Sequence, residues 1–99
     1  MKIPKRINVG RKQYKVATVH KMERYKTVGR VSYADKEITI ATHSNSTQRK
    51  FNDVEVSDSF WHELTHAILK DMGNKLEANE AFVTAFSSRL NKAILSAEF

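Results

Sequence analysis

The chain lacks cysteine and any long hydrophobic run, and it has only one proline and three glycines among its 99 residues. The absence of cysteine disfavours a small secreted domain held by disulfides, so we expect a cytoplasmic protein. No stretch of about 18 apolar residues is present, which predicts no transmembrane helix. The basic start at residues 1–6 precedes no apolar segment, which predicts no signal peptide. A hydrophobic content of 40% argues against a disordered or collagen-like chain.

Charge is abundant but unevenly distributed along what we expect to be one domain, residues 1–99. Residues 1–50 contain 13 lysines and arginines and three acidic residues, a net charge of +10. Residues 51–99 contain four basic and eight acidic residues, a net charge of −4. A basic half can bind phosphates or attract an acidic protein, although no nucleic-acid-binding motif is recognisable in it. Charge alone leaves an ordinary solvated surface and a binding surface as alternatives.

The first half of the domain is predicted to form a sheet. Four segments are rich in β-branched residues or partly alternate in polarity: residues 3–9, 14–19, 28–33 and 37–42. Residues 34–36 separate the last two segments and are typical of a tight hairpin turn. We therefore expect three or four strands, mainly antiparallel, in the β-rich half, and a polar loop over residues 43–48.

A first helix is predicted to begin near residue 52. Asn52 and Glu55 form a candidate capping box at its start, and the helix runs to Met72, where Gly73 provides the stop. Its apolar residues cover a wide arc, which indicates burial on more than one face. The alternative N-terminal caps are Ser57 and Asp58.

A second helix is predicted over residues 77–97. Apolar residues recur in it at spacings of three and four, and the stripe consists of Phe82, Val83, Phe86, Leu90, Ala93 and Ile94. The order of a β-rich half followed by two helices, residues 51–99, predicts an α+β fold.

One motif in the first predicted helix indicates chemistry: His62-Glu63-Leu64-Thr65-His66, which is H-E-x-x-H. On a helix, His62 and His66 lie one turn apart on the same side, so both imidazoles can reach one metal ion. Glu63 lies next to them and can meet a metal-bound water without being a ligand. This spacing suits the hydrolysis of an amide bond at a zinc ion.

Catalytic zinc normally binds three protein ligands and keeps one position open. A metzincin would have glycine and histidine where this chain has Leu69 and Met72, which excludes that class. Asp71 points to the opposite side of the helix from His62, which excludes it as a ligand. The remaining candidates for the third ligand are Glu77 and Glu80.

Residues 60–90 resemble the gluzincin arrangement, in which H-E-x-x-H is followed by a glutamate on the next helix. The sequence Asn79-Glu80-Ala81 is similar to the N-E-A in which thermolysin-like enzymes place their third zinc ligand. The chain resembles even more closely the very small zincin-like metallopeptidases encoded by phages. Those proteins combine a short β-rich front, H-E-x-x-H-A, a glycine, and E-x-F-V at the start of a final helix. The matching residues are His62-Glu63-Leu64-Thr65-His66-Ala67, Gly73 and Glu80-Ala81-Phe82-Val83.

The resemblance implies a minimal zincin-like fold and the zinc-dependent hydrolysis of a peptide or protein substrate. It implies that His62, His66 and Glu80 bind Zn²⁺ and that Glu63 is the general base toward the zinc-bound water. Glu77 is the fallback for the third ligand. If a phage encodes the chain, the resemblance implies the host cytoplasm as its location.

Zincins bind substrate as an additional strand along a sheet edge and stabilise an oxyanion with a hydrogen-bond donor. The resemblance therefore implies that the hairpin at residues 28–42 forms this edge. The candidate contacts to the oxyanion or the substrate are Tyr33, His43 and Arg49.

The alternative function is a basic binding module for nucleic acid or an acidic host protein, carried by residues 1–50. In that case the zinc site would be structural or vestigial. A structural site is expected to be closed by a fourth protein ligand such as His43.

Overall fold

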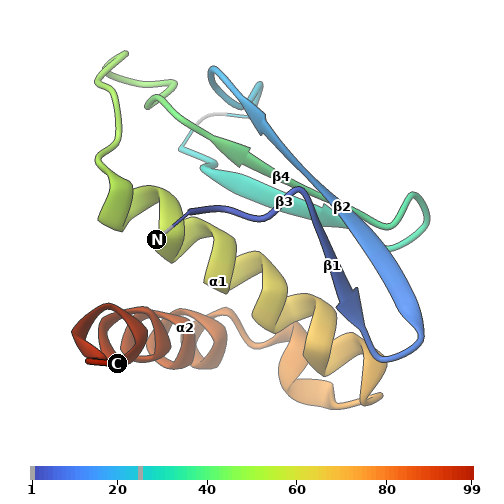
Figure 1. Cartoon of the computed structure of the whole chain (residues 1–99). Coiled ribbons are helices and arrows are strands. Elements are labelled where there is room, and N and C mark those ends of the chain that lie inside the picture. Colours follow the sequence, from blue (N-terminus) through green and yellow to red (C-terminus); the bar gives the residue numbers. More distant parts are fainter. Residues whose placement is uncertain (1, 25) are drawn as a thin grey trace.

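The strands of the described residues form one sheet, and both α-helices lie on the same side of it, so the fold is α+β as the sequence predicts (Figure 1). The computed structural model describes residues 2–24 and 26–99. Within these residues, no helix is both long and apolar enough to cross a membrane. The elements are β1 (Arg6–Val9), β2 (Lys12–Val19), β3 (Gly29–Ser32), β4 (Glu37–Ala41), α1 (Asp53–Asp71), the 3₁₀ helix η1 (Lys75–Ala78) and α2 (Glu80–Ser96).

The strand order in the sheet is β1-β2-β4-β3, and its pairing is mainly antiparallel, as predicted, with one parallel pair at the centre. β1 pairs with β2, and β3 with β4, in the antiparallel sense, but β2 and β4 are parallel. The sheet is therefore mixed. Ile38, Ile40 and Ala41 of β4 are fully buried, which favours an interior position for this strand. The hairpin consequently leaves β3 at the edge.

Helix α1 begins and ends where the sequence predicts. The side chain of Asn52 accepts a hydrogen bond from the backbone amide of Glu55 at 2.8 Å, and the Glu55 carboxylate accepts one from the Asn52 amide at 3.0 Å. At the other end, Gly73 has a φ of +65°, a left-handed conformation that glycine adopts without steric cost. Local signals therefore set both ends of the helix that carries His62 and His66.

Helix α1 lies between the sheet and α2, so it is buried on two sides, as its wide apolar arc predicts (Figure 1). Among the described residues, α2 contacts α1 and η1 but no strand. The hydrophobic core therefore lies between α1 and the sheet. Its buried residues are Val9, Tyr14, Ile38, Ile40, Phe60, Leu64 and Ala67.

The second helical segment differs from the single helix predicted over residues 77–97. The 3₁₀ helix η1 comes first, and α2 begins only at Glu80. Asn74 caps η1 and Asn79 caps α2, since each side chain accepts a hydrogen bond from a backbone amide within the element that follows. Because the non-helical residue Asn79 separates the two helical elements, Glu77 lies in η1 rather than in α2.

The buried face of α2 differs in part from the predicted apolar stripe. Val83 is fully buried, as predicted, but the side chains of Phe86 and Ile94 are 48% and 42% exposed. Ser87 and Asn91 are buried instead. They follow Val83 at spacings of four and eight, so the three residues form one line along the helix. The stripe prediction is therefore wrong for Phe86, Ala93 and Ile94, because the contact face is rotated toward polar residues.

A buried hydrogen-bond network explains why polar residues occupy this face. The hydroxyl of Ser57 donates to the side-chain oxygen of Asn91 at 2.8 Å, and the Asn91 amide nitrogen donates to the carbonyl oxygen of Val54 at 3.2 Å. Ser57 and Asn91 are almost inaccessible to solvent, and buried polar groups require such partners. The network joins the first turns of α1 to α2, so it fixes how the two helices lie against each other.

Candidate metal centre

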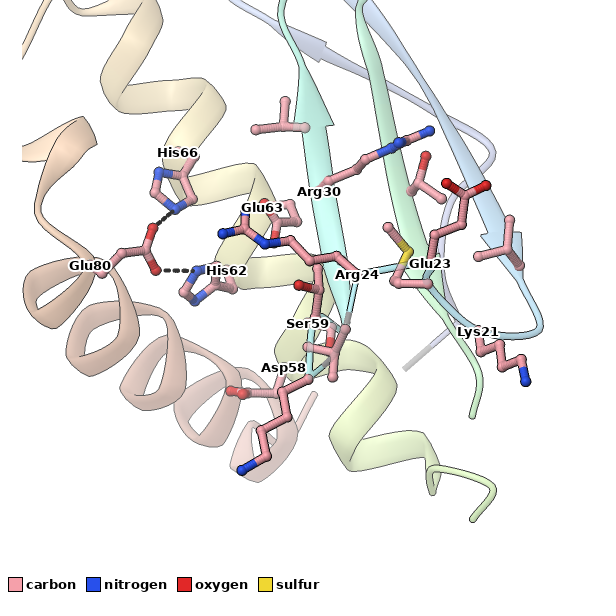
Figure 2. Close-up of a pocket in the computed structure, with 18 of the residues that line it drawn as sticks. Lys21, Glu23, Arg24, Arg30, Asp58, Ser59, His62, Glu63, His66 and Glu80 are labelled. Atoms are coloured by element: carbon pink, nitrogen blue, oxygen red, sulfur yellow. Dashed lines mark hydrogen bonds and ion pairs between the residues drawn. The ribbon is translucent and has the colours of Figure 1, made fainter. Parts of the chain in front are cut away.

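The two histidines of the H-E-x-x-H motif and one glutamate of α2 converge on one point (Figure 2). His62 and His66 are one turn apart on α1, with ring centroids separated by 5.0 Å. Their Nε2 atoms lie 3.1 Å and 2.7 Å from the two carboxylate oxygens of Glu80. Glu80 is the first residue of α2 and directly follows the N-cap Asn79. The start of the helix therefore fixes the position of the Glu80 carboxylate beside α1.

This set of donors fits a divalent metal ion. One donor atom from each of His62, His66 and Glu80 lies within 4.8 Å of the other two. Ligand atoms about 2 Å from a tetrahedral ion lie roughly 3.3 Å from one another, so small side-chain shifts would complete the geometry. The sequence left Glu77 and Glu80 as alternatives, and the structure groups Glu80 with the two histidines.

A hydrogen bond on the far side of the His66 ring prepares its Nε2 atom for a cation. Nδ1 lies 2.9 Å from the carbonyl oxygen of Glu77, which can only accept a hydrogen bond, so Nδ1 carries a proton. In the neutral ring, Nε2 then presents a lone pair to the Glu80 carboxylate 2.7 Å away. Two electron-rich atoms at this distance need a proton or a metal cation between them. The chemistry of the donors therefore suits the binding of a cation.

Glu63 lies beside this point on α1 and is only 7% exposed. Burial, the largest cause, raises the pKa of its carboxyl group to about 7. His66 lowers the pKa by a smaller amount, and Glu80 raises it slightly. A carboxyl group with a pKa near neutrality can both accept and release a proton at neutral pH. Glu63 is therefore suited to proton transfer.

The side chain of Glu63 packs against Gly29 of the edge strand β3, where the absence of a side chain leaves room for it. A Cβ atom at Gly29 would lie 3.2 Å from Cγ and 3.2 Å from Oε2 of Glu63, and 3.2 Å from the carbonyl oxygen of Thr39. A larger residue would therefore press on the carboxylate. Sequence reasoning missed Gly29, because no local pattern around it indicates a contact with a helix far along the chain.

An open cavity of about 940 Å³ lies beside the converging residues and extends along β3 (Figure 2). Gly29, Arg30 and Val31 line it from the edge strand, and the two motif histidines line it from α1. The side chain of Glu80 is 67% exposed, so the centre is open to solvent on this side. An extended ligand can therefore approach the centre along the edge of the sheet.

Tyr33, predicted as an oxyanion or substrate contact, does line this cavity. However, its hydroxyl donates a hydrogen bond of 2.6 Å to the carboxylate of Glu77. Burial and, next, this hydrogen bond raise the pKa of Tyr33, so the hydroxyl keeps its proton at neutral pH. The hydroxyl already has a partner, and contact with substrate stays a prediction.

His43 and Arg49, the other two predicted contacts, lie outside the cavity. His43 stacks on His20 with ring centroids 3.9 Å apart, and Arg49 forms a 2.7 Å ion pair with Glu55 at the start of α1. The metal-binding group found among the described residues does not include His43, so the structure forms no closed site with His43 as a fourth ligand. Substrate contact by these two residues stays a prediction that the geometry does not favour.

Comparison of the chain with protein-family models, curated proteins and solved structures finds no match. The interpretation of the centre therefore depends on its own residues: two imidazoles and a carboxylate that can hold a metal, with a buried carboxyl group beside them that can move a proton.

Proposed function

We propose that this chain is a zinc-dependent metallopeptidase of the minimal zincin-like type. The observation that carries the proposal is the convergence of His62, His66 and Glu80 beside the buried carboxyl group of Glu63. Two imidazoles and one carboxylate leave one coordination position open on zinc, as catalytic sites require. The exposure of Glu80 keeps this side of the centre accessible to a substrate.

In this proposal each residue of the centre has one task. His62 and His66 bind the metal through Nε2, and Glu80 binds it through its carboxylate. Zinc, when bound, polarises the substrate carbonyl and lowers the pKa of water. Glu63 accepts a proton from the attacking water at its carboxylate and passes that proton to the leaving amine.

The proposed substrate is a peptide or protein segment that binds in an extended form along β3. Among the described residues, β3 pairs with β4 alone, so its outer edge offers backbone groups for hydrogen bonding. Gly29, Arg30 and Val31 line the cavity on this edge. A strand added here would carry its peptide bonds past Glu63.

Metal content and hydrolysis test this proposal in two steps. Elemental analysis of the purified wild type should give about one zinc per chain, and Glu80→Ala should lose most of it, because a third ligand is removed. Glu63→Gln should keep the zinc but lose the hydrolysis of a peptide library, because an amide cannot accept the proton. Asp53→Asn, a carboxylate-to-amide change at the start of α1, is the matched control and should behave like the wild type.

Two results would contradict the metallopeptidase proposal. One is a wild type that binds no metal even after zinc is added. The other is a Glu63→Gln variant that hydrolyses peptides at the wild-type rate, which would indicate a contaminating peptidase or a different base.

A second candidate function is favoured by the open face of the sheet. Ile7 and Tyr14 face the core, so the alternation of side chains along β1 and β2 turns Arg6 and Lys15 to the opposite face. Both α-helices lie on the core side of the sheet (Figure 1). Arg6 and Lys15 are register partners, and like charges directly opposite each other repel, but Glu37 of β4 is the register partner of Lys15 on its other side, so Arg6 is the cation that a bound anion would favour most. This face is a candidate surface for nucleic acid or an acidic protein.

Charge reversal tests this second candidate. The double variant Arg6→Glu with Lys15→Glu should weaken binding to duplex DNA, RNA or polyglutamate. For the nucleic acids, the slope of log affinity against log salt concentration should fall by the equivalent of about two phosphate contacts. Arg89→Glu with Lys92→Glu changes the net charge equally but lies on α2, so it is the control. Equal losses in both double variants, or no binding by the wild type, would contradict a specific surface.

A further inference from the structure

Glu77 contacts His66 in a way that the proposed reaction does not use. Its carbonyl oxygen accepts the hydrogen bond from Nδ1 of His66 at 2.9 Å, and its carboxylate accepts one from the hydroxyl of Tyr33 at 2.6 Å. The carboxylate also lies 3.8 Å from Nδ1 of His66. Both oxygens of Glu77 that lie near His66 face Nδ1, whereas the Glu80 carboxylate contacts Nε2. Glu77 therefore approaches the ring from behind the centre rather than from the metal side.

Tyr33 connects the sheet to both helical segments at this point. It follows the edge strand β3, and its hydroxyl oxygen also lies 3.4 Å from the carbonyl oxygen of His66. The ammonium group of Lys70 lies 5.3 Å from the centre of the Tyr33 ring, which holds the ring on α1. The hydroxyl is thus held between α1 and η1, where it can donate to Glu77.

The element that carries Glu77 depends on such contacts for its position. η1 is a four-residue 3₁₀ helix without a buried residue, and 3₁₀ hydrogen bonds have poorer geometry than those of an α-helix. Glu80 follows Glu77 by only three residues. A contact that holds η1 against α1 therefore also restricts the position of Glu80, the proposed third ligand.

We propose that Tyr33 and Glu77 are positioning residues for the metal centre, an inference that rests on the metal site of the proposed function. Their hydrogen bond, here named the Tyr33–Glu77 latch, holds the carbonyl oxygen of Glu77 against Nδ1 of His66. With Nδ1 committed as a donor, Nε2 is the atom left to bind the metal. Hydrogen-bond partners behind a ligand histidine typically change metal affinity by about ten- to hundredfold when they are removed.

Zinc affinity of the full chain, measured by competition with a chromophoric chelator, tests the latch. Tyr33→Phe removes only the donor, and it should weaken zinc binding by about tenfold or more. Glu77→Ala should weaken it similarly. Glu77→Gln should bind zinc nearly as the wild type does, because the amide oxygen still accepts the hydrogen bond from Tyr33. In cobalt-loaded protein, Tyr33→Phe should also change the visible spectrum, which reports the geometry around the ion.

Two controls separate positioning from general destabilisation. Tyr14→Phe is the matched change at a buried tyrosine in the core, and it should leave zinc affinity unchanged. Thermal unfolding of each variant without metal should show that Tyr33→Phe remains folded. The double variant Tyr33→Phe with Glu77→Ala should lose no more zinc affinity than the weaker-binding single variant, because each change removes the same hydrogen bond.

Two results would overturn the latch: wild-type zinc affinity in Tyr33→Phe, or a Glu77→Gln variant as weak as Glu77→Ala. The second result would mean that the charge of Glu77 matters, as it would if Glu77 were a ligand. A wild type that binds no zinc would overturn both the latch and the metallopeptidase proposal. A wild type that binds zinc without hydrolysing peptides contradicts only the proposed function, since the latch is measured by affinity.

Discussion

Helices α1 and α2 are of similar length, 19 and 17 residues, but different contacts hold them in place. α1 packs the apolar side chains of Phe60 and Leu64 against the sheet, whereas α2 packs Ser87 and Asn91 against α1 and leaves Phe86 half-exposed. A layer on each side buries a wide arc of α1, whereas the elements that α2 contacts among the described residues are α1 and η1. In this chain, apolar periodicity therefore predicted the burial of α1, which two layers cover, but it failed in part for α2, whose contact face includes two buried polar residues.

The candidate metal centre joins these two unequal helices. His62 and His66 belong to the helix that the core anchors, and Glu80 belongs to the helix whose buried residues are Val83, Ser87 and Asn91. Ligand binding stabilises whichever state holds the ligand, so a bound metal would add to the attachment of α2.

The largest expected effect contrasts one phenylalanine from each helix. Phe60→Ala should reduce the free energy of unfolding by about 3–5 kcal/mol, because it leaves a cavity in the core. Phe86→Ala should reduce it by less than about 1 kcal/mol, since the side chain is already half-exposed. Urea unfolding of both variants measures the difference. Equal losses would mean that α2 buries its apolar face in solution, for example against another molecule.

The next effect concerns the polar contact between the helices. Asn91→Ala should reduce the free energy of unfolding by about 1–3 kcal/mol, because it removes two buried hydrogen bonds between the helices, although the Ser57 hydroxyl keeps its 3.0 Å hydrogen bond to the Val54 carbonyl oxygen. Ser88→Ala, a change at a half-buried neighbour, is the control for helix propensity. A loss of stability no greater than that of the control would show that the hydrogen bond from Ser57 to the Val54 carbonyl oxygen satisfies both groups without Asn91.

A third change separates the sheet side of the centre from the α2 side. Gly29→Ala should lower kcat for peptide hydrolysis by about tenfold, because the added methyl group presses on Glu63 and displaces its carboxylate. Zinc content should remain as in the wild type, since the proposed ligands lie on α1 and α2. Ser32→Ala, at the end of β3 that does not line the cavity, is the control. Zinc loss in Gly29→Ala would show that the change disturbs α1 as a whole.

The smallest expected effect is a pH dependence at the start of α1. The hydrogen bond from Arg49 and, next, the one from the Asn52 amide lower the pKa of Glu55 to about 2. Because the folded pKa lies below that of the unfolded chain, this stabilisation is present above about pH 4.5 and is lost as the pH falls toward 2. The wild type should therefore exceed Glu55→Gln in urea midpoint at pH 6, and the difference should shrink toward pH 2. Glu98→Gln is the control, and a difference independent of pH would contradict the role of the Glu55 charge.

Features that depend on neighbours in the chain could be predicted from the sequence. The capping box at Asn52, the left-handed Gly73 and the shared face of His62 and His66 all arise within a few residues. The α+β class followed from the change of periodicity near residue 50. These predictions held because the hydrogen bonds and side-chain spacings involved are local.

Features that depend on distant segments could not be predicted in this way. The parallel pairing of β2 with β4 and the polar contact face of α2 follow from which layers cover each element. The second helix was predicted to begin at Glu77, because the two successive asparagine caps at Asn74 and Asn79 were not recognised.

The sequence by itself determined that His62 and His66 share one face of a capped helix and that Glu63 lies next to His62, because an α-helix has a fixed periodicity. Only the tertiary structure decided that Glu80 meets Nε2 of these histidines while Glu77 contacts Nδ1 of His66 from behind. The choice depends on where η1 and α2 fold back against α1. That position is set by contacts between segments that lie far apart in the chain.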